Sequence, residues 1–346
     1  MRGGEVRWRV RGERFAIGRI HRIVGFGMSV RYRRIVLFQN PASGAHNSEP
    51  RQRIRNRLEA ISDSLSEVTV DHGLNLAGRA AEAADANADL VVVAGGDGTV
   101  REVAGALVRT EMTLGIIPLG TANNLALSLN LPHDPDAVCD LIEAGLTRHI
   151  DVGLADQHHA FFEVAGVGVD ADLFPIGEEV KGGRFHGIAR AVRLALMHRQ
   201  TSVELRFDRP VDEAYQSSFR GKAPLKRRRR RFRNPRRSVR LRCSFVAVGN
   251  GPYYGTNFNV CPGAILDDGL FSIGVYRDFS KLELLRHFRS ISRGRRQLHP
   301  KMEMFKAKMV EVWSVTRLSV HVDGHPIGTT PVRFDVLPKA LKVITP

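Results

Sequence analysis

The chain has 346 residues, of which 43% are hydrophobic and 25% are charged. This composition is that of a globular protein and excludes disorder throughout, and the length is sufficient for two domains with separate cores. No uninterrupted apolar run approaches the roughly 18 to 20 residues of a membrane-spanning helix. The three cysteines, Cys139, Cys243 and Cys261, lack metal-ligand spacing and predict buried thiols in a reducing compartment.

The net charge of +16 is concentrated in two segments. Residues 1–34 hold ten Arg and two Glu, and residues 220–242 hold thirteen Lys and Arg with no acidic residue. The remainder of the chain is therefore mildly acidic, which argues against a nucleic-acid-binding protein. We expect residues 1–29 to form a flexible basic extension. The basic insertion at 213–238 is interpreted as a solvated loop or as a surface for anionic lipid headgroups. Nucleic-acid contact is the third interpretation and the least favoured, because base-stacking aromatic residues are sparse there.

Apolar strands alternate with helices from residue 35 to about residue 117. The pattern predicts strands at 35–39, 67–71, 90–94 and 114–117, and helices at 49–64, 75–86 and 100–109. Such alternation is typical of a mainly parallel sheet with helices on both faces. Residues 30–150 are therefore predicted to form a three-layer α/β domain.

The pattern changes after about residue 150. Strand-like segments follow at 159–165, 201–207, 240–249, 269–276, 309–315 and 317–321, and helices are expected only at 188–198 and 281–292. We therefore expect residues 151–346 to form an antiparallel, β-sandwich-like domain. Its C-terminal tail is expected to return toward the cleft between the domains.

A glycine-rich turn, Gly95 to Thr99, follows the apolar strand at 90–94 and carries one carboxylate and one hydroxyl. Glycine lets the backbone approach a ligand closely, and the helix that follows would direct its N-terminus at the same spot. Backbone N–H groups and hydroxyls bind phosphate oxygens, so the turn predicts a phosphate site. Asp97 is a candidate for holding a magnesium ion there.

Two further loops, Asn40 to Gly44 and Pro118 to Asn124, also follow predicted strands. Loops after the carboxyl ends of strands line the ligand crevice of an open α/β sheet, so we expect all three loops to converge. The chain has no GxxxxGK[ST] motif, which excludes a conventional P-loop. The GxGxxA match at 166–171 does not open a βαβ unit and is interpreted as a tight β connection.

Taken in order, these motifs resemble the diacylglycerol kinase catalytic domain of the bacterial lipid kinase and sphingosine kinase superfamily. They are Asn40-Pro41-x-Ser43-Gly44, Gly95 to Thr99 and Pro118 to Ala126. Residues 150–153, 161–170, 262–270 and 322–326 are similar to later motifs of that family, so the likeness covers roughly residues 30–340. The resemblance implies an enzyme that uses ATP and Mg²⁺ to phosphorylate the hydroxyl of a lipid such as diacylglycerol.

The resemblance also implies roles for individual positions. The expected catalytic residues are Asp97, His325 and Asp323. The expected ATP-binding residues are Asn40, Ser43, Thr69, Gly95, Gly96, Asp97, Gly98, Thr99, Val100, Arg101, Thr121 and Asn124. A second, structural magnesium ion is expected at Ile265, Asp268 and Leu270, where an apolar residue would offer its main-chain carbonyl.

The sequence departs from the family pattern at the late Asp-Gly-Glu motif, which here reads Asp323-Gly324-His325. The glutamate of that motif is the proposed acceptor of the lipid proton. Three interpretations stay open. His325, with an ordinary pKa of ~6.5, is the base; Asp97 or Asp323 is the base or a metal contact; or the kinase is weakened or inactive.

Two other functions compete with the lipid kinase. NAD kinase shares the glycine-rich turn, although residues 120–124 resemble the lipid kinase loop. The other alternative is a regulator that binds nucleotide or lipid without catalysis. The expected partners are a lipid substrate and an anionic membrane surface, without nucleic acid, and a homodimer is one candidate assembly. The expected location is the cytoplasm, with peripheral membrane association.

Overall fold

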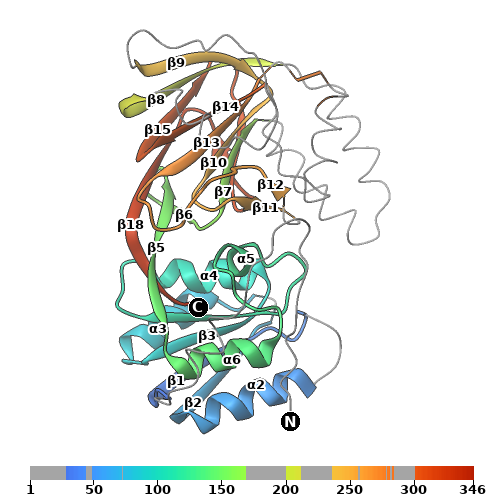
Figure 1. Ribbon diagram of the computed structural model, residues 1–346, viewed down its shortest axis with the longest axis vertical. Coiled ribbons are helices and arrows are strands. Elements are labelled where there is room, and N and C mark those ends of the chain that lie inside the picture. The colour runs from blue at the N-terminus through green and yellow to red at the C-terminus, as the bar shows by residue number, and fades with distance from the viewer. Residues whose placement is uncertain are drawn as a thin grey trace, which may run out of the picture.

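The computed structural model describes residues 29–43, 49–71, 73–168, 200–211, 236–255, 258–277, 279–280, 283 and 301–346. Figure 1 shows two parts stacked along the long axis, with helices around a sheet at the bottom and strands above them. The N-terminal extension, most of the basic insertion and nearly all of the two helices predicted at 188–198 and 281–292 lie outside the described residues.

Four parallel strands form the centre of the N-terminal domain. Their order is β2 (Ser62–Thr69), β1 (Tyr32–Gln39), β3 (Leu90–Gly95) and β4 (Thr113–Pro118). Every residue of β3 and β4 is buried, as expected for strands covered on both faces. Helices α2 (Glu49–Ala60) and α6 (Pro135–Ala144) lie together on one face, and α3 (Leu76–Asp85) and α4 (Asp97–Leu107) on the other (Figure 1). The predicted three-layer arrangement is confirmed.

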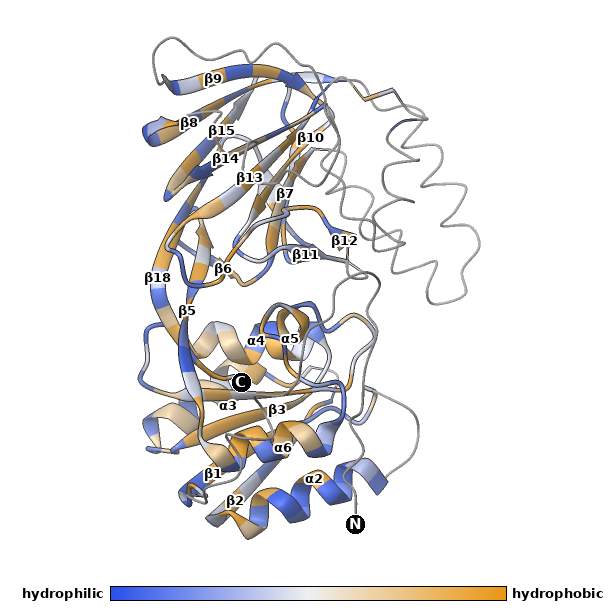
Figure 2. Ribbon diagram, viewed as in Figure 1, coloured by the Kyte–Doolittle hydropathy of each residue, from blue (hydrophilic) through white to orange (hydrophobic). Residues whose placement is uncertain are grey.

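The boundary between the first helix and the second strand differs from the prediction. Helix α2 ends at Ala60 rather than at residue 64, and β2 begins at Ser62 rather than at residue 67. β2 is the edge strand, and only Ser62 in it is fully buried, so its sequence lacks the apolar run that marks a central strand. Figure 2 shows α2 as mainly hydrophilic, and its buried residues are Ile54 and Leu58.

Two sheets face each other in the C-terminal domain. One has six antiparallel strands in the order β14 (Met302–Ala307), β13 (Phe271–Tyr276), β10 (Phe245–Gly249), β7 (Val164–Gly168), β16 (Ser319–Val322) and β17 (His325–Thr329). The other contains β18 (Val332–Ile344), β15 (Met309–Ser314), β8 (Thr201–Val211) and β9 (Arg236–Cys243). Phe161, at the end of β6 (His159–Phe161), stacks on Phe271 at 5.5 Å and meets Phe334 edge-on at 6.0 Å in the core between them.

Two of the predicted strands are each divided into two. The segment predicted at 240–249 contains the end of β9 and all of β10, because the chain passes from one sheet to the other at Ser244. The segment predicted at 159–165 contains β6 and the start of β7. A short ribbon, β11 (Tyr253–Tyr254) and β12 (Phe258–Asn259), lies beside the six-stranded sheet (Figure 1).

One long strand connects the domains. β18 pairs with β15 in the C-terminal domain, with β5 (Thr147–Ala155) along most of its length, and in parallel with β4 in the N-terminal domain. The register with β5 shifts between Leu337 and Leu341, where Lys339 has φ of 53°. The C-terminal tail therefore returns to the N-terminal domain, as predicted. Among the described residues, no helix has the length and apolar character needed to cross a bilayer.

Candidate functional site

The glycine-rich turn joins β3 to α4 at the carboxyl end of the parallel sheet. Gly96 is the N-cap residue, with an extended ψ of −179°, and Asp97 begins the helix, three residues earlier than predicted. Glycine offers no side chain to cap the first N–H groups of the helix. Such a helix start attracts an anion, because its N–H groups and the helix dipole both favour negative charge.

The loop after β1 contacts this turn through Asn40. The Asn40 side-chain amide donates a hydrogen bond to Thr99 Oγ1 at 3.0 Å, and its backbone N–H donates to the Ala94 carbonyl at 3.0 Å. Ser43 lies close by, since a Cβ added to Gly96 would be 3.9 Å from Ser43 Oγ. Asn40 therefore positions Thr99 and the loop around it.

The loop after β4 contacts the glycine-rich turn directly through main-chain atoms. A Cβ added to Gly120 would lie 2.6 Å from the Gly96 Cα, a separation at which one of the two loops must move. The Leu119 N–H donates to the Gly95 carbonyl at 3.0 Å. The three predicted loops therefore converge, and the absence of a side chain at Gly96 and Gly120 permits it.

The Asp97 carboxylate links the glycine-rich turn to the 118–124 loop through two hydrogen bonds. Oδ2 accepts the Asn123 N–H at 2.9 Å and Oδ1 accepts the Asn124 N–H at 2.7 Å, at the start of helix α5 (Asn124–Ser128). Asn123 has φ of 51°, and its side chain bonds both the N–H and the carbonyl of Gly120. Asp97 thus holds the 118–124 loop in one conformation.

A cavity of about 620 Å³ opens between this assembly and the C-terminal domain. Its lining includes six of the predicted nucleotide-site residues and both Asp323 and His325. The remaining lining residues were not predicted. The full set is Asp97, Gly98, Val100, Arg101, Thr121, Ala122, Asn124, Leu125, Phe162, Glu163, Tyr253, Tyr254, Gly255, Asp323, Gly324, His325 and Pro326.

The other predicted nucleotide-site residues lie beside the cavity and do not line it. These are Asn40, Ser43, Thr69, Gly95, Gly96 and Thr99. Asn40 and Thr99 bond each other behind the turn, as described above. Thr69 is exposed at the end of β2, opposite Gln39 of β1, and so lies at the same edge of the sheet.

Asp323 is bound by three backbone N–H groups. Its carboxylate accepts from Phe162 at 2.8 Å, Glu163 at 3.1 Å and Val164 at 3.0 Å. Burial raises the pKa of Asp323, while these N–H groups and the charge of Arg101 oppose the rise. The carboxylate therefore fixes the chain between β6 and β7, which makes it a positioning group rather than a free base.

His325 begins β17 on the cavity wall and remains exposed to solvent. Partial burial lowers the pKa of His325, the charge of Arg101 lowers it further, and Glu102 acts in the opposite direction. The imidazole is therefore mainly neutral at pH 7 and can accept a proton. This position is compatible with the predicted role of His325 as a base, which stays a prediction.

The turn between β16 and β17, which leads to His325, is held in place by a buried side chain of the C-terminal domain, His321. His321 is buried, its ring stacks on Tyr254 at 5.0 Å between centroids, and its Nε2 is 3.1 Å from the Tyr254 hydroxyl. Its Nδ1 accepts the Gly324 N–H at 3.3 Å, so Nε2 carries the proton and donates it to Tyr254. This pair connects the Asp323 turn to the Tyr254 wall of the cavity.

Glu163 is the charged residue among the cavity-lining residues that the sequence prediction missed. It is buried between Phe162 and Val164, and its Oε2 accepts the Ser128 hydroxyl at 3.0 Å across the domain boundary. Burial raises the pKa of Glu163 well above its ordinary value, and the charge of Asp323 adds to the rise. A carboxylate within the apolar run 161–169 was the available signal, because such a group is rarely buried without a role.

Of the residues predicted to bind a structural magnesium ion, Asp268 has an ion-pair partner within the fold, and the main-chain carbonyls of Ile265 and Leu270 stay predicted ligands. Asp268 Oδ2 pairs with the Lys306 ammonium group, and Oδ1 accepts the Leu270 N–H at 3.0 Å. The side chain of Ile265 is half exposed to solvent. A lysine therefore supplies the positive charge beside Asp268. In the described part of the chain, no group of three or more His, Cys, Asp or Glu side chains is arranged to hold a metal ion.

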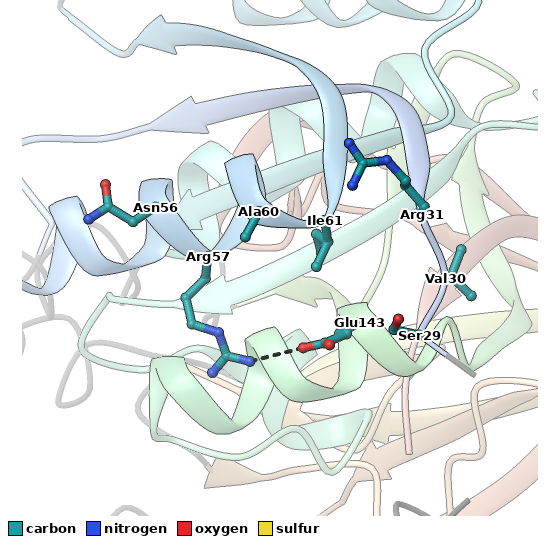
Figure 3. A pocket seen from close by; sticks show the side chains of 8 residues that line it. All are labelled: Ser29, Val30, Arg31, Asn56, Arg57, Ala60, Ile61 and Glu143. Carbon is teal, nitrogen blue, oxygen red and sulfur yellow. Dashed lines mark hydrogen bonds and ion pairs between the residues drawn. The ribbon is translucent and has the colours of Figure 1, made fainter. Parts of the chain in front are cut away.

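A second cavity, of about 440 Å³, lies on the opposite side of the N-terminal domain. Figure 3 shows it between α2, α6 and the start of β1, with Arg57 directed at Glu143. Arg57 also pairs with Asp140 at 2.6 Å, so its charge is already balanced within the fold. This cavity shares no lining residue with the converging loops, and we do not assign it to the site.

Comparison with known families matches both parts of the chain. Residues 34–155 match the model of the diacylglycerol kinase catalytic domain. Residues 224–345 match the model of the YegS C-terminal NAD kinase beta sandwich-like domain. Together these matches include every residue that lines the cavity except Phe162 and Glu163, which lie between the two matched ranges.

Similar proteins carry names that agree with these matches. A diacylglycerol kinase of Staphylococcus saprophyticus is 27% identical over 77% of this chain and 80% of its own length. A YegS-like lipid kinase of Klebsiella pneumoniae is 26% identical over 77% of this chain and 80% of its own length. A solved diacylglycerol kinase structure from Bacillus anthracis covers 92% of this chain and 98% of its own, with a TM-score of 0.67 and 20% identity, which supports the fold.

The contact between Gly96 and Gly120 gives a prediction about stability. Gly120→Ala should lower the free energy of unfolding by about 1 to 3 kcal/mol, because the new methyl group overlaps the Gly96 backbone. Gly105→Ala on the same helix as Asp97 is the control: its Cβ would meet nothing within 4 Å. That change should raise the same free energy by about 0.5 to 1 kcal/mol. Urea denaturation measures both, and an unaltered midpoint for Gly120→Ala would contradict the contact.

The pairing of Asp268 with Lys306 gives a second prediction. Removing divalent cations with a chelator should leave the unfolding temperature of the protein unchanged. Lys306→Met should lower the free energy of unfolding by about 1 to 3 kcal/mol, because Asp268 loses a charged hydrogen-bond partner. Lys308→Met, two residues along and exposed, should change it little. A fall in the unfolding temperature of the unaltered protein on chelation would show that a metal ion is needed after all.

Proposed function

The chain belongs to the diacylglycerol kinase-like lipid kinase family, and we propose that it transfers the γ-phosphoryl group of MgATP to the hydroxyl of a lipid such as diacylglycerol. The observation that carries this proposal is one shared cavity. The glycine-rich turn and the start of α4 line it from one domain, and Asp323 and His325 line it from the other. Donor and acceptor can therefore meet between the domains.

The phosphate groups of ATP are assigned to the N-terminal side of the cavity. Gly98, Val100 and Arg101 of α4 line it together with Thr121. The first N–H groups of α4 favour anionic oxygens, and the Arg101 guanidinium adds a positive charge. Arg101 also influences the pKa values of Asp323 and His325 on the opposite wall, so its charge acts across the cavity.

Magnesium enters this proposal as part of the substrate MgATP. When bound, it neutralises charge that develops on the transferred phosphoryl group. Asp97 lines the cavity at the phosphate end and is the carboxylate suited to contact it. The second function of Asp97 is the attachment of the 118–124 loop through the Asn123 and Asn124 N–H groups.

The lipid is assigned to the C-terminal side, where apolar and aromatic side chains prevail. Phe162, Tyr253, Tyr254 and Pro326 line the cavity there, and Leu125 adds an apolar contact from α5. Such a lining favours a hydrocarbon chain, while the polar groups at its edge orient a hydroxyl. Diacylglycerol is the first candidate because it is the substrate in the names of several relatives.

The two alternative functions are less well supported. NAD kinase requires a dinucleotide acceptor, whereas the matched catalytic domain and the named relatives are those of lipid kinases. A regulator without catalysis would bind ATP or lipid but would not consume ATP when lipid is added. Lipid-dependent ATP consumption therefore separates all three functions.

Asp97→Ala should reduce lipid-dependent ATP consumption by at least about 100-fold, because both the loop attachment and the charge at the phosphate end are lost. Purified protein is assayed with ATP and mixed micelles that contain diacylglycerol, phosphatidylglycerol or a sphingoid base. Asp97→Asn keeps the size of the side chain, and Glu111→Ala removes an exposed carboxylate from the loop before β4. Glu111→Ala should be fully active. Near-normal turnover by both Asp97 variants would refute the assignment.

We also propose that the protein approaches anionic membranes with the end of the molecule that carries β9. β9 is the last strand of its sheet, and Figure 1 places it at the end opposite the N-terminal domain. Arg237, Arg240 and Arg242 of β9 are exposed, and Arg240 pairs with Glu204. The predicted basic insertion at 213–238, most of which lies outside the described residues, ends within the first residues of this strand.

The double change Arg237→Glu and Arg242→Glu should weaken binding to vesicles that contain phosphatidylglycerol by at least about tenfold, since each basic residue near such a surface contributes ~1 kcal/mol. Arg53→Glu with Arg55→Glu on α2 is the matched control, because it changes the net charge equally at the other end of the molecule. Vesicle sedimentation measures binding, with phosphatidylcholine vesicles as the uncharged reference. Equal losses in the two double variants would show that only net charge matters.

A further inference from the structure

Glu163 is a buried carboxyl group at the boundary between the domains. Its backbone N–H donates to Asp323, and its backbone carbonyl accepts the N–H groups of Asn250 and Gly251. Glu163 is among the residues that line the cavity, as is Phe162. The main chain around Glu163 is therefore fixed on both sides, and the carboxyl group has a defined position in the cavity wall.

The two oxygens of this carboxyl group differ in their surroundings. Oε2 accepts the Ser128 hydroxyl at 3.0 Å. Oε1 is buried and has no hydrogen-bond partner among the described residues. Leaving a buried acceptor without a partner is destabilising, and such groups in native structures usually have a functional reason. A hydroxyl group that enters the cavity beside Glu163 would supply the partner.

Gly251 makes room for this carboxyl group. A Cβ added to Gly251 would lie 2.3 Å from Glu163 Oε2 and 2.9 Å from Oε1. Any larger residue at 251 would displace both oxygens. The carboxyl group is thus held between Gly251 and Ser128, each from a different domain.

The surroundings of Glu163 raise its pKa above the ordinary value of a glutamate. Burial raises its pKa, and the carboxylates of Asp323 and Asp97 raise it further. The Ser128 hydroxyl and the Tyr253 N–H, which bond the carboxyl group, act in the opposite direction. A general base works best when its pKa lies near the working pH, and raised glutamates serve this purpose.

We propose that Glu163 is the catalytic base that accepts the proton of the lipid hydroxyl at Oε1. The proposal rests on the lipid kinase function given above. The hydroxyl oxygen forms a new bond to the γ-phosphorus of ATP while the bond from that phosphorus to the β,γ-bridging oxygen breaks. The hydroxyl proton passes to Glu163, ADP leaves with the electron pair of the broken bond, and the products are the lipid phosphate and ADP.

The other acidic groups of the cavity are already engaged with the backbone. Asp323 accepts three N–H groups and Asp97 accepts two, and both sets hold loops in place. His325 stands on the exposed part of the wall, whereas Glu163 is shielded from solvent. A shielded base retains the proton in contact with the substrate rather than with water.

Glu163→Gln keeps the shape of the side chain and removes its ability to accept a proton. We expect kcat to fall by about 100- to 10,000-fold with little change in the KM for ATP. In the unaltered enzyme kcat should rise with pH as Glu163 ionises, because only the carboxylate form accepts a proton. This rise, the acidic limb of the pH profile of kcat, should disappear in Glu163→Gln. Glu163→Asp, which retains the carboxylate, should restore part of kcat together with the limb.

Ser128→Ala supplies a readout that a purely structural role would not change. The Ser128 hydroxyl lowers the pKa of Glu163, so its removal should move the acidic limb of kcat to higher pH. Urea denaturation of each variant shows whether the fold is retained, and variants are compared at matched folded fraction.

The outcomes separate this inference from the proposed function. If the unaltered enzyme consumes ATP with lipid and Glu163→Gln keeps kcat within threefold and an unchanged acidic limb, Glu163 is not the base and the kinase function stands. If His325→Ala instead removes the limb, the proton passes to His325. If the unaltered protein never consumes ATP with any lipid class, the proposed function fails and this inference fails with it.

Discussion

The candidate site depends on the hydrogen bonds by which Asp97, in the glycine-rich turn, holds the 118–124 loop. One carboxylate accepts two N–H groups, from Asn123 and Asn124, and each such charge-assisted bond contributes about 1.5 to 3 kcal/mol. It acts where the Gly96 backbone leaves no room for a side chain on Gly120. The 118–124 loop then starts α5, whose Asn124 and Ser128 bond Gly255 and Glu163 of the second domain. Changes at the glycine-rich turn are thereby connected to the cavity wall of the second domain.

The relative position of the domains rests on a second carboxylate, Asp151 of β5. Its oxygens accept the Lys339 N–H at 2.8 Å and the Gly269 N–H at 2.6 Å, at the irregular part of β18 and in the 265–270 loop. Burial raises the pKa of Asp151, and these N–H groups oppose the rise. Asp151 therefore stabilises the strand that crosses from one domain to the other, and the cavity between the domains keeps its width through backbone hydrogen bonds.

The parts of the fold that the sequence predicts well are those whose burial is uniform. β3 is apolar throughout because both of its faces are covered, and its predicted range of 90–94 differs from the observed strand by one residue. β2 was misplaced because an exposed edge strand needs few apolar residues. β18 was not predicted at all. Its pairing with β4, β5 and β15 depends on residues far away in the chain, and Lys339 interrupts its alternation with a positive φ.

In the site, the sequence motifs predict which loops meet, but they do not predict the chemical role of each acidic side chain. The loop motifs correctly bring Asn40, Asp97 and Asn124 together, because their order along parallel strands determines where they meet. The role of an acidic side chain depends instead on how many N–H groups reach it. Asp323 has three, and Glu163 has one oxygen without any among the described residues, although both lie in the same cavity wall. Burial raises the pKa of both carboxyl groups, but three N–H groups oppose the rise at Asp323, so proton transfer is better suited to Glu163.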